Sequence, residues 1–508
     1  MRHSQVLIAL WDGVEARGTG GTAEVVGFMT RGIPDRYSEV FDLPSGLLDP
    51  VESGRVYHIL TPHAKNPLPE GKAFEICPLV AGGDRNEALD RIFAHVEGFN
   101  RDVRCLDTRS ARDIKIKTAR LFPDADAMVL CGALQSLRER FGLADTLANH
   151  FQRLTYRTLG WLFALVFVAI VLFGFYAHLA VLSSGQFAFL GLYLTVLAVA
   201  IAWFRVADWR NWQNKHQDYR ALAEGLRVQF FWAIAGLSDS VADHYLHRQK
   251  SELDWIRHAI RAWGTRVLPM SGGRLEAVIS HWVGDQRGYF ERAAHRDSKH
   301  LMYLAEIGAG LLLVSFGIGA LEVFSVLPPH APEETAEAPL WIRSLVGILG
   351  VPVLLLVIAD RFRALRKHKD LWEAIKGLSA LVLGVSAGLA LTFLVLLAPR
   401  HLPAYLAAHL DQRAHEWWIV AMVLTAAIPA LLHAYGDKRA LAEHEKQYKH
   451  MASLFARAQE RLQAHLHDRN PLKTRTLIFE LGKDALAEHG DWVLLHRERP
   501  IEPPRAEL

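Results

Sequence analysis

The chain has 508 residues, enough for several domains, and it combines 51% hydrophobic with 22% charged residues. This mixture, with a mean hydropathy of +0.10, indicates apolar segments that alternate with highly charged ones. The formal net charge of +3 is close to neutral for this length and gives no case for nucleic-acid binding. Three well-separated cysteines without a C-x-x-C pair indicate buried thiols in a reducing compartment.

The first predicted element is a strand that leads into a glycine-rich turn. Val6 to Leu10 is an unbroken apolar run, typical of a strand buried on both faces of a parallel sheet. Thr22 to Met29 then predicts a helix. Glycines let the backbone approach a phosphate, and a helix N-terminus offers unpaired N–H groups and partial positive charge. The candidate nucleotide-binding residues are Asp12, Gly13, Gly18, Gly20, Gly21, Thr22 and Glu24. A tight turn without a ligand is the alternative interpretation.

The sequence LIALWDG, followed by RGTGGTAEVV, resembles the nucleotide-facing part of SLOG domains. This Rossmann-like family includes the LOG phosphoribohydrolases and the ADP-ribose-sensing domains of TRPM channels. Gly20, Gly21 and Thr22 match the LOG pattern P-G-G-x-G-T-x-x-E, whereas the proline is missing and Glu24 comes one residue early. The resemblance therefore implies nucleotide binding more than hydrolase activity. Because this stretch follows several βα units in SLOG domains, we expect the N-terminal SLOG half to be missing and the pocket to be incomplete. The alternative is that residues 1–150 form a smaller α/β domain.

The segment that follows connects this motif to apolar helices. Residues 35–75 predict an ordered connection with a short strand at Val56 to Leu60, and Ala88 to Asn100 has the spacing of a helix. Residues 1–150 are therefore assigned to a partial SLOG-like α/β nucleotide-sensing region and its connector.

Long apolar runs predict a polytopic membrane protein with about six transmembrane helices, since ~20 residues cross a bilayer. Residues 151–205 form a transmembrane hairpin and residues 301–436 contain four further helices. The predicted spans are Leu159 to Leu182, Phe187 to Phe204, Leu304 to Leu327, Leu340 to Ile358, Leu378 to Leu397 and Trp417 to Leu432. Basic residues flank the hairpin and fill the loop from Asp360 to Lys369, so both termini are expected in the cytoplasm.

Two charged segments predict cytoplasmic helices, a module at residues 206–300 and a C-terminal region at 437–508. Asp218 to Trp232 predicts an amphipathic helix, with Arg220, Glu224 and Arg227 spaced for ion pairs on its surface. Tyr245 to Trp263 predicts a second helix, and WVLLH near the C-terminus is either a strand or a segment lying on the preceding helices. The expected fold class is mainly α, with a small N-terminal α/β region that is partly Rossmann-like.

Four motifs resemble the SMODS- and SLOG-associating two-transmembrane effector families, collectively SLATT. They are the hairpin 159–204, YRALAE at 219–224, Trp282-x-x-x-Gln286-x-x-Tyr289, and ELGKDALAE with DWVLLHRERP near the C-terminus. The resemblance implies a homo-oligomeric effector that responds to a nucleotide-derived ligand. It also implies that the effector lies in the cell inner membrane of a bacterium and permeabilises or gates that membrane in antiphage defence.

The sequence contains no catalytic constellation, and its histidines lack the spacing of a metal site. We therefore expect no catalytic residue, no metal and no cofactor besides a nucleotide-derived signal, and as partners the membrane, that nucleotide and further copies of the chain. The alternative is an enzyme, a membrane-anchored nucleotide phosphoribohydrolase or a NAD-cleaving protein. A transporter is disfavoured because the spans show no charged midplane or broken-helix pair.

Overall fold

The computed structural model describes much of the chain, with gaps. The described residues are 6–15, 20–32, 34, 55–62, 66, 73–79, 83–106, 108–123, 130, 132–179, 186–246, 250–263, 272–325, 404–468 and 470–501. Two predicted spans, Leu340 to Ile358 and Leu378 to Leu397, lie outside these residues. The chain divides into two units that each combine distant segments. Unit 1 contains 1–153, 213–290 and 450–498; unit 2 contains 154–212, 291–449 and 499–508.

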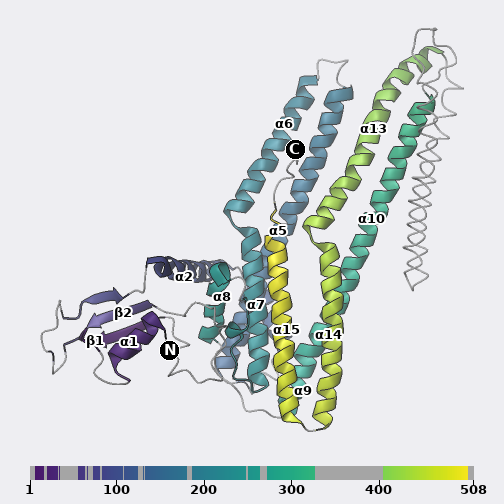
Figure 1. Ribbon diagram of the computed structural model, residues 1–508. Helices are drawn as coiled ribbons and strands as arrows, with labels where there is room; N and C mark the ends of the chain where they lie inside the picture. The colour runs from purple at the N-terminus through teal and green to yellow at the C-terminus, as the bar shows by residue number, and fades with distance from the viewer. Residues whose placement is uncertain are drawn as a thin grey trace. The chain divides into compact units, whose positions relative to one another are not determined.

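Unit 1 begins with a small α/β element. Strand β1, Val6–Trp11, pairs in parallel with β2, Arg55–Leu60, and β2 pairs antiparallel with β3, Ile76–Leu79. Helix α1, Thr22–Arg31, packs on one face of this sheet (Figure 1). The contact buries a small core of Ala9, Val26, Met29 and Val56. The predicted strands β1 and β2 and the predicted helix α1 are confirmed, whereas β3 was not predicted.

The other face of β1 is exposed, so the prediction of burial on both faces is wrong. Ile8 is 62% exposed and Leu10 61%, and Ile76 of β3 is also 61% exposed. Period-2 alternation sends these side chains away from α1, and α1 is the described helix that packs on the sheet. An unbroken apolar run therefore does not prove two-sided burial here.

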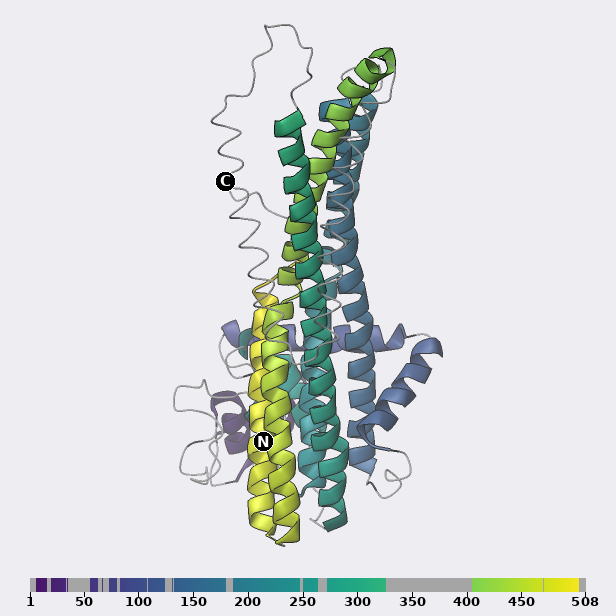
Figure 2. The same cartoon turned by 90° about the vertical axis from the view of Figure 1, so that its right-hand side faces the viewer.

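The remaining described helices belong to the two units as follows. Unit 1 contains α2 Gly83–Arg104, α3 Thr108–Leu121, η4 Val241–Asp243, α8 Lys250–Trp263, α9 Gly272–Val278, the π-helix η6 Ile279–Gly284 and α15 Pro471–Arg497. Unit 2 contains the π-helix η2 Phe175–Leu179, α6 Gln186–Trp209 and α13 Ala404–Lys438. Four helices contribute residues to both units, namely α5 Gly132–Gly174, α7 Trp212–Ile234, α10 Asp285–Ser325 and α14 Leu441–His467. The last part of α14 runs beside α15 (Figures 1 and 2).

Helix α7 lies at the centre of unit 1. From His216 to Ile234 every residue except Arg220 and Arg227 is buried. The helix was predicted correctly, but its amphipathic character was not, because neighbouring helices cover both its apolar and its charged sides. The predicted helix from Tyr245 also begins later, at Lys250, since Leu246 has a positive φ of 56° that no α-helix accepts.

Four helices among the described residues are long and apolar enough to cross a membrane. They are Gly132–Ala177, Phe187–Ile234, Gly273–Gly319 and Ile419–Lys438. Each overlaps one of the predicted spans. At most 28% of the residues in each apolar window are buried inside the structure, so apolar side chains such as Phe187, 79% exposed, remain on the surface, as hydrocarbon requires.

These helices contact one another within unit 2. The ring of Phe173 on α5 lies 5.7 Å from that of Tyr193 on α6. Phe175 of η2 makes an edge contact with Trp417 on α13, at 5.8 Å between ring centroids. The Ser315 hydroxyl on α10 donates a hydrogen bond of 3.1 Å to a carbonyl oxygen of α13. Apolar helices that pack in this way bury few polar groups, which favours a membrane environment.

Near the C-terminus, the segment WVLLH belongs to helix α15 and not to a strand. The side chain of Asn470 accepts a hydrogen bond from the backbone N–H of Lys473, and Pro471 occupies the first helical position. These are common helix-start features.

The exposed Cys105 contradicts the expectation of a buried thiol at that position.

Candidate functional site

The glycine turn lies between the end of β1 and the start of α1. Asp12 and Gly13 follow β1, with Gly13 at a φ of +83° that favours glycine. Gly20, at φ +85°, and Gly21 precede Thr22, the first residue of α1. The structure therefore places the predicted residues on both sides of one βα turn, except Gly18, which lies outside the described residues.

The two candidate carboxylates of this turn make local contacts. The Asp12 side chain accepts a hydrogen bond of 3.3 Å from the backbone N–H of Val14. Glu24, in the first turn of α1, accepts one of 2.5 Å from the backbone N–H of Gly20. A carboxylate at this position complements the helix dipole. A phosphate that approached the same helix end would meet the negative charge of Glu24.

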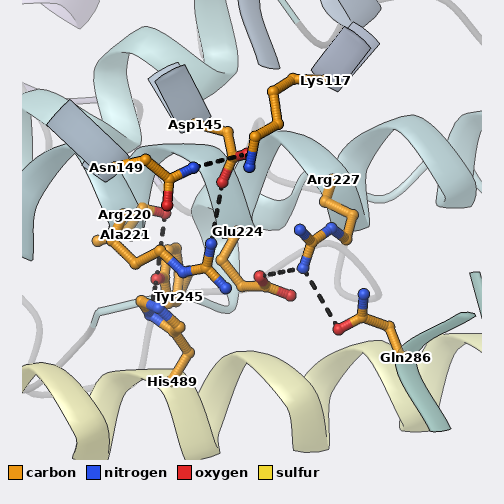
Figure 3. A network of polar contacts seen from close by, with 10 residues as sticks. All are labelled: Lys117, Asp145, Asn149, Arg220, Ala221, Glu224, Arg227, Tyr245, Gln286 and His489. Atoms are coloured by element: carbon orange, nitrogen blue, oxygen red, sulfur yellow. Dashed lines mark hydrogen bonds and ion pairs between the residues drawn. The ribbon is translucent and has the colours of Figure 1, made fainter. Parts of the chain in front are cut away.

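A second polar constellation surrounds α7 and was not predicted (Figure 3). Asp145 on α5 lies 2.7 Å from the Lys117 ammonium of α3 and 2.9 Å from the Arg220 guanidinium of α7. Its side chain is only 5% exposed. A buried carboxylate needs such partners, because an unpaired charge in the interior is costly. Asp145 thus links three helices of unit 1.

Farther along α7, Arg227 donates a hydrogen bond of 2.5 Å to Glu224 and one of 3.3 Å to the Gln286 side chain on α10. The Arg227–Glu224 pair has the spacing predicted from the sequence, but it is buried rather than on a solvent-facing surface. The Arg227 guanidinium also lies 5.2 Å from the ring centroid of Phe141 on α5. Such a cation–π contact is strongest where water is excluded.

Tyr245 and His489 form a buried pair on the other side of the network. The Tyr245 hydroxyl donates to the carbonyl oxygen of Ala221 at 3.2 Å and lies 2.8 Å from Nδ1 of His489. Burial lowers the pKa of His489 well below its usual value, and the positive charges of Arg220 and Arg227 lower it further. His489 is therefore neutral near pH 7.

The N-terminal part of α7 makes further polar contacts. Asp102 on α2 accepts hydrogen bonds from Lys215 at 3.0 Å and from the Tyr219 hydroxyl at 2.6 Å. Asp218 pairs with Arg497 of α15 at 2.8 Å. Lys215, Asp218, Tyr219 and Arg220 of α7 thus have partners on other helices, so α7 orients its neighbours by specific polar contacts as well as by apolar packing.

The polar contacts around α7 combine ion pairs, such as Arg220 with Asp145, and hydrogen bonds, such as that of Tyr245 to Ala221. Among the described residues no group of three or more histidine, cysteine or acidic side chains is arranged to hold a metal. Comparisons of the chain with protein-family models, with curated proteins and with solved structures found no match.

Sequence reasoning missed the network because it assigned the charges of α7 to a solvent-facing surface. One signal was available: the segment from Ala221 to Ile234 contains only two charged residues, Glu224 and Arg227, among large apolar side chains. A helix with apolar residues on all sides is buried, and charges on such a helix need partners from other elements. Which elements supply them depends on tertiary packing.

Proposed function

We propose that this chain is a nucleotide-responsive membrane effector that permeabilises or gates a membrane. The observation that carries the proposal is the combination, in one chain, of a glycine turn between β1 and α1 and four helices apolar enough to span a bilayer. A strand followed by a glycine turn and a helix is the arrangement in which Rossmann-like proteins hold phosphates.

The resemblance to SLOG and SLATT proteins supports the same proposal and adds antiphage defence in a bacterial inner membrane as its setting. A ligand changes the membrane part only if it prefers one of two arrangements of the protein, since equal affinity for both shifts neither population. Helix α5 contributes both Asp145 of the polar network and the apolar window of a predicted span.

The test is leakage from liposomes that contain the full-length protein and are loaded with carboxyfluorescein, with ADP-ribose as the probe ligand. We expect dye release that saturates with ADP-ribose and is absent from liposomes without protein. If ADP-ribose binds the protein but releases no dye, the effector proposal is wrong.

Replacing Glu24 with glutamine sharpens this test. Glutamine keeps an oxygen that can accept from the Gly20 N–H but removes the negative charge at the start of α1. A phosphate then meets less repulsion, so leakage should begin at a lower ADP-ribose concentration. Glu75→Gln removes an exposed carboxylate before β3 and serves as the matched control, with an unchanged response.

The enzyme alternative makes the opposite prediction for Glu24. If Glu24 activates a nucleophile or stabilises a cleavage step, Glu24→Gln abolishes turnover of NAD or a nucleoside monophosphate. Chromatography of nucleotides from the same liposomes separates the two proposals, because an effector releases dye without consuming its ligand.

A further inference from the structure

A second candidate binding site lies in unit 1, away from the glycine turn. It is a pocket with a volume of about 80 Å³ lined by α3, α5, α7, η6 and the first residues of α10. A single buried water needs roughly 10–15 Å³ by the same kind of measure, and pockets for drug-sized ligands measure about 300 Å³ or more. The pocket therefore has room for one small charged group.

The charged side chains that line this pocket are mainly positive. Four are cationic and two are acidic: Lys117, Arg120, Arg220 and Arg227 against Asp145 and Asp285. Asp145 lies between Lys117 and Arg220, and Glu224 pairs with Arg227. Arg120, exposed on α3, has no acidic partner within the part of the chain that the structure describes. Positive charge thus exceeds negative charge around the cavity.

The inner wall of the pocket is apolar. Leu121, Phe141 and Phe231 line it and are at most 4% exposed. Charged groups beside such a wall interact more strongly than they do in open water, because the local dielectric constant is lower. An anion in this pocket would be attracted by the arginines and would have to fit the shape of the rigid side chains around it.

The backbone beside the pocket is irregular. The π-helix η6 supplies His281 and leads directly into Asp285 and Gln286. Within it, the ring of Trp282 stacks on Phe231 at 5.6 Å with an angle of 7° between the planes. Single π turns inside helices occur often at functional sites. This one sets the positions of three lining side chains.

We propose that this pocket binds a phosphate group. Guanidinium groups bind phosphate oxygens through paired N–H donors, and a lysine adds a point charge. The cavity has room for the phosphate itself, with any attached group directed to solvent past the exposed Arg120. This proposal does not depend on a nucleotide at the glycine turn, so either site can be refuted without the other.

The first experiment titrates the full-length protein in detergent with inorganic phosphate by calorimetry, at an ionic strength held constant with sodium chloride. The parent protein should bind phosphate saturably. Arg120→Gln should weaken binding about tenfold, since one charged hydrogen bond contributes about 1.4 kcal/mol to affinity. Arg112→Gln, which removes an exposed arginine from the same helix outside the pocket, should bind as the parent does.

Asp285→Asn tests the sign of the effect. It removes a carboxylate that lines the pocket, so phosphate should bind more tightly than in the parent. The proposal is overturned by a parent protein that shows no saturable binding, by equal weakening in Arg112→Gln and Arg120→Gln, or by an unchanged affinity in Asp285→Asn.

A second arm distinguishes a free phosphate from a lipid headgroup. The protein is titrated in nanodiscs of phosphatidylcholine alone and of phosphatidylcholine with phosphatidic acid. The lipid headgroup is the occupant if two results are found together. The parent binds phosphate more weakly in the nanodiscs with phosphatidic acid, and Arg120→Gln binds phosphate equally in both kinds of nanodisc. Equal binding in both nanodiscs identifies a free phosphate ligand. Either result requires the saturable binding of the first experiment.

Discussion

Replacing Gly482 with alanine puts a methyl group against a ring that has no space to move. Gly482 lies on α15, and an added Cβ would sit 2.6 Å from Cε2 and 2.7 Å from Cζ2 of Trp232 on α7, with Nε1 still closer. Trp232 is 0% exposed and its ring packs on Phe479 at 5.1 Å. Because a buried indole is rigid, the two helices must separate or the ring must leave its position.

The magnitude follows from two opposing effects. Overpacking of a core costs about 3 kcal/mol at the upper end of its usual range. Alanine in place of glycine inside a helix returns about 1 kcal/mol, so Gly482→Ala should lower the free energy of unfolding by about 2 kcal/mol. Gly490→Ala on the same helix is the control, since its Cβ meets nothing within 4 Å and the substitution should stabilise by up to about 1 kcal/mol.

The assay is the loss of helical circular dichroism on heating or on addition of denaturant, in one mild detergent for all variants. A Gly482→Ala protein as stable as the parent would refute the packing argument. Trp232→Leu removes the ring atoms that the new methyl group meets. In that background Gly482→Ala should become neutral or stabilising, because two residues in contact do not contribute additively.

Three further predictions concern other parts of unit 1. In the folded protein the pKa of His489 lies below its usual 6.5. As the pH falls below 6.5, the unfolded chain therefore binds the proton first. The stability that the fold has above pH 6.5 decreases between pH 6.5 and the folded pKa. Unfolding midpoints of the parent should therefore fall between pH 7 and 5 more steeply than those of His489→Gln. Asp145→Asn leaves Lys117 and Arg220 without their carboxylate partner. It should lower the free energy of unfolding by about 3 kcal/mol, measured with denaturant. A decrease below about 1 kcal/mol would contradict the burial of these charges. In the α/β element, Met29→Ala should cost about 2 kcal/mol and expose the segment to limited proteolysis, whereas Ile8→Thr, at a residue 62% exposed, should leave the proteolysis rate nearly unchanged.

Local pattern was sufficient where the element itself was the question. The apolar runs predicted the helices that now form four candidate spans, and the spacing of Ala88 to Asn100 predicted α2. The glycine turn was placed correctly between β1 and α1. In each case the relevant interaction is either within a few residues or with a uniform apolar environment, so sequence periodicity carries the information.

The sequence pattern gave wrong predictions where contacts with elements distant in the sequence determine burial or charge pairing. Ile8 is apolar and yet exposed, because burial of a strand face depends on which helices pack on it. The charges of α7 are spaced for pairing along one helix, yet Arg220 pairs with Asp145 on α5, 75 residues away in sequence. The helix predicted from Tyr245 is interrupted because Leu246 has a positive φ. Nothing in the sequence indicated this backbone conformation.

The sequence by itself determined the kinds of element in this protein: a glycine turn between a strand and a helix, apolar helices of membrane length, and charged helices outside them. Only the tertiary structure decided that α7 is buried and that its charged side chains meet partners on α2, α5, α10 and α15. The physical reason is that hydrophobic periodicity depends on local geometry, whereas the pairing of buried charges and the shape of a pocket depend on helices brought together from distant parts of the chain.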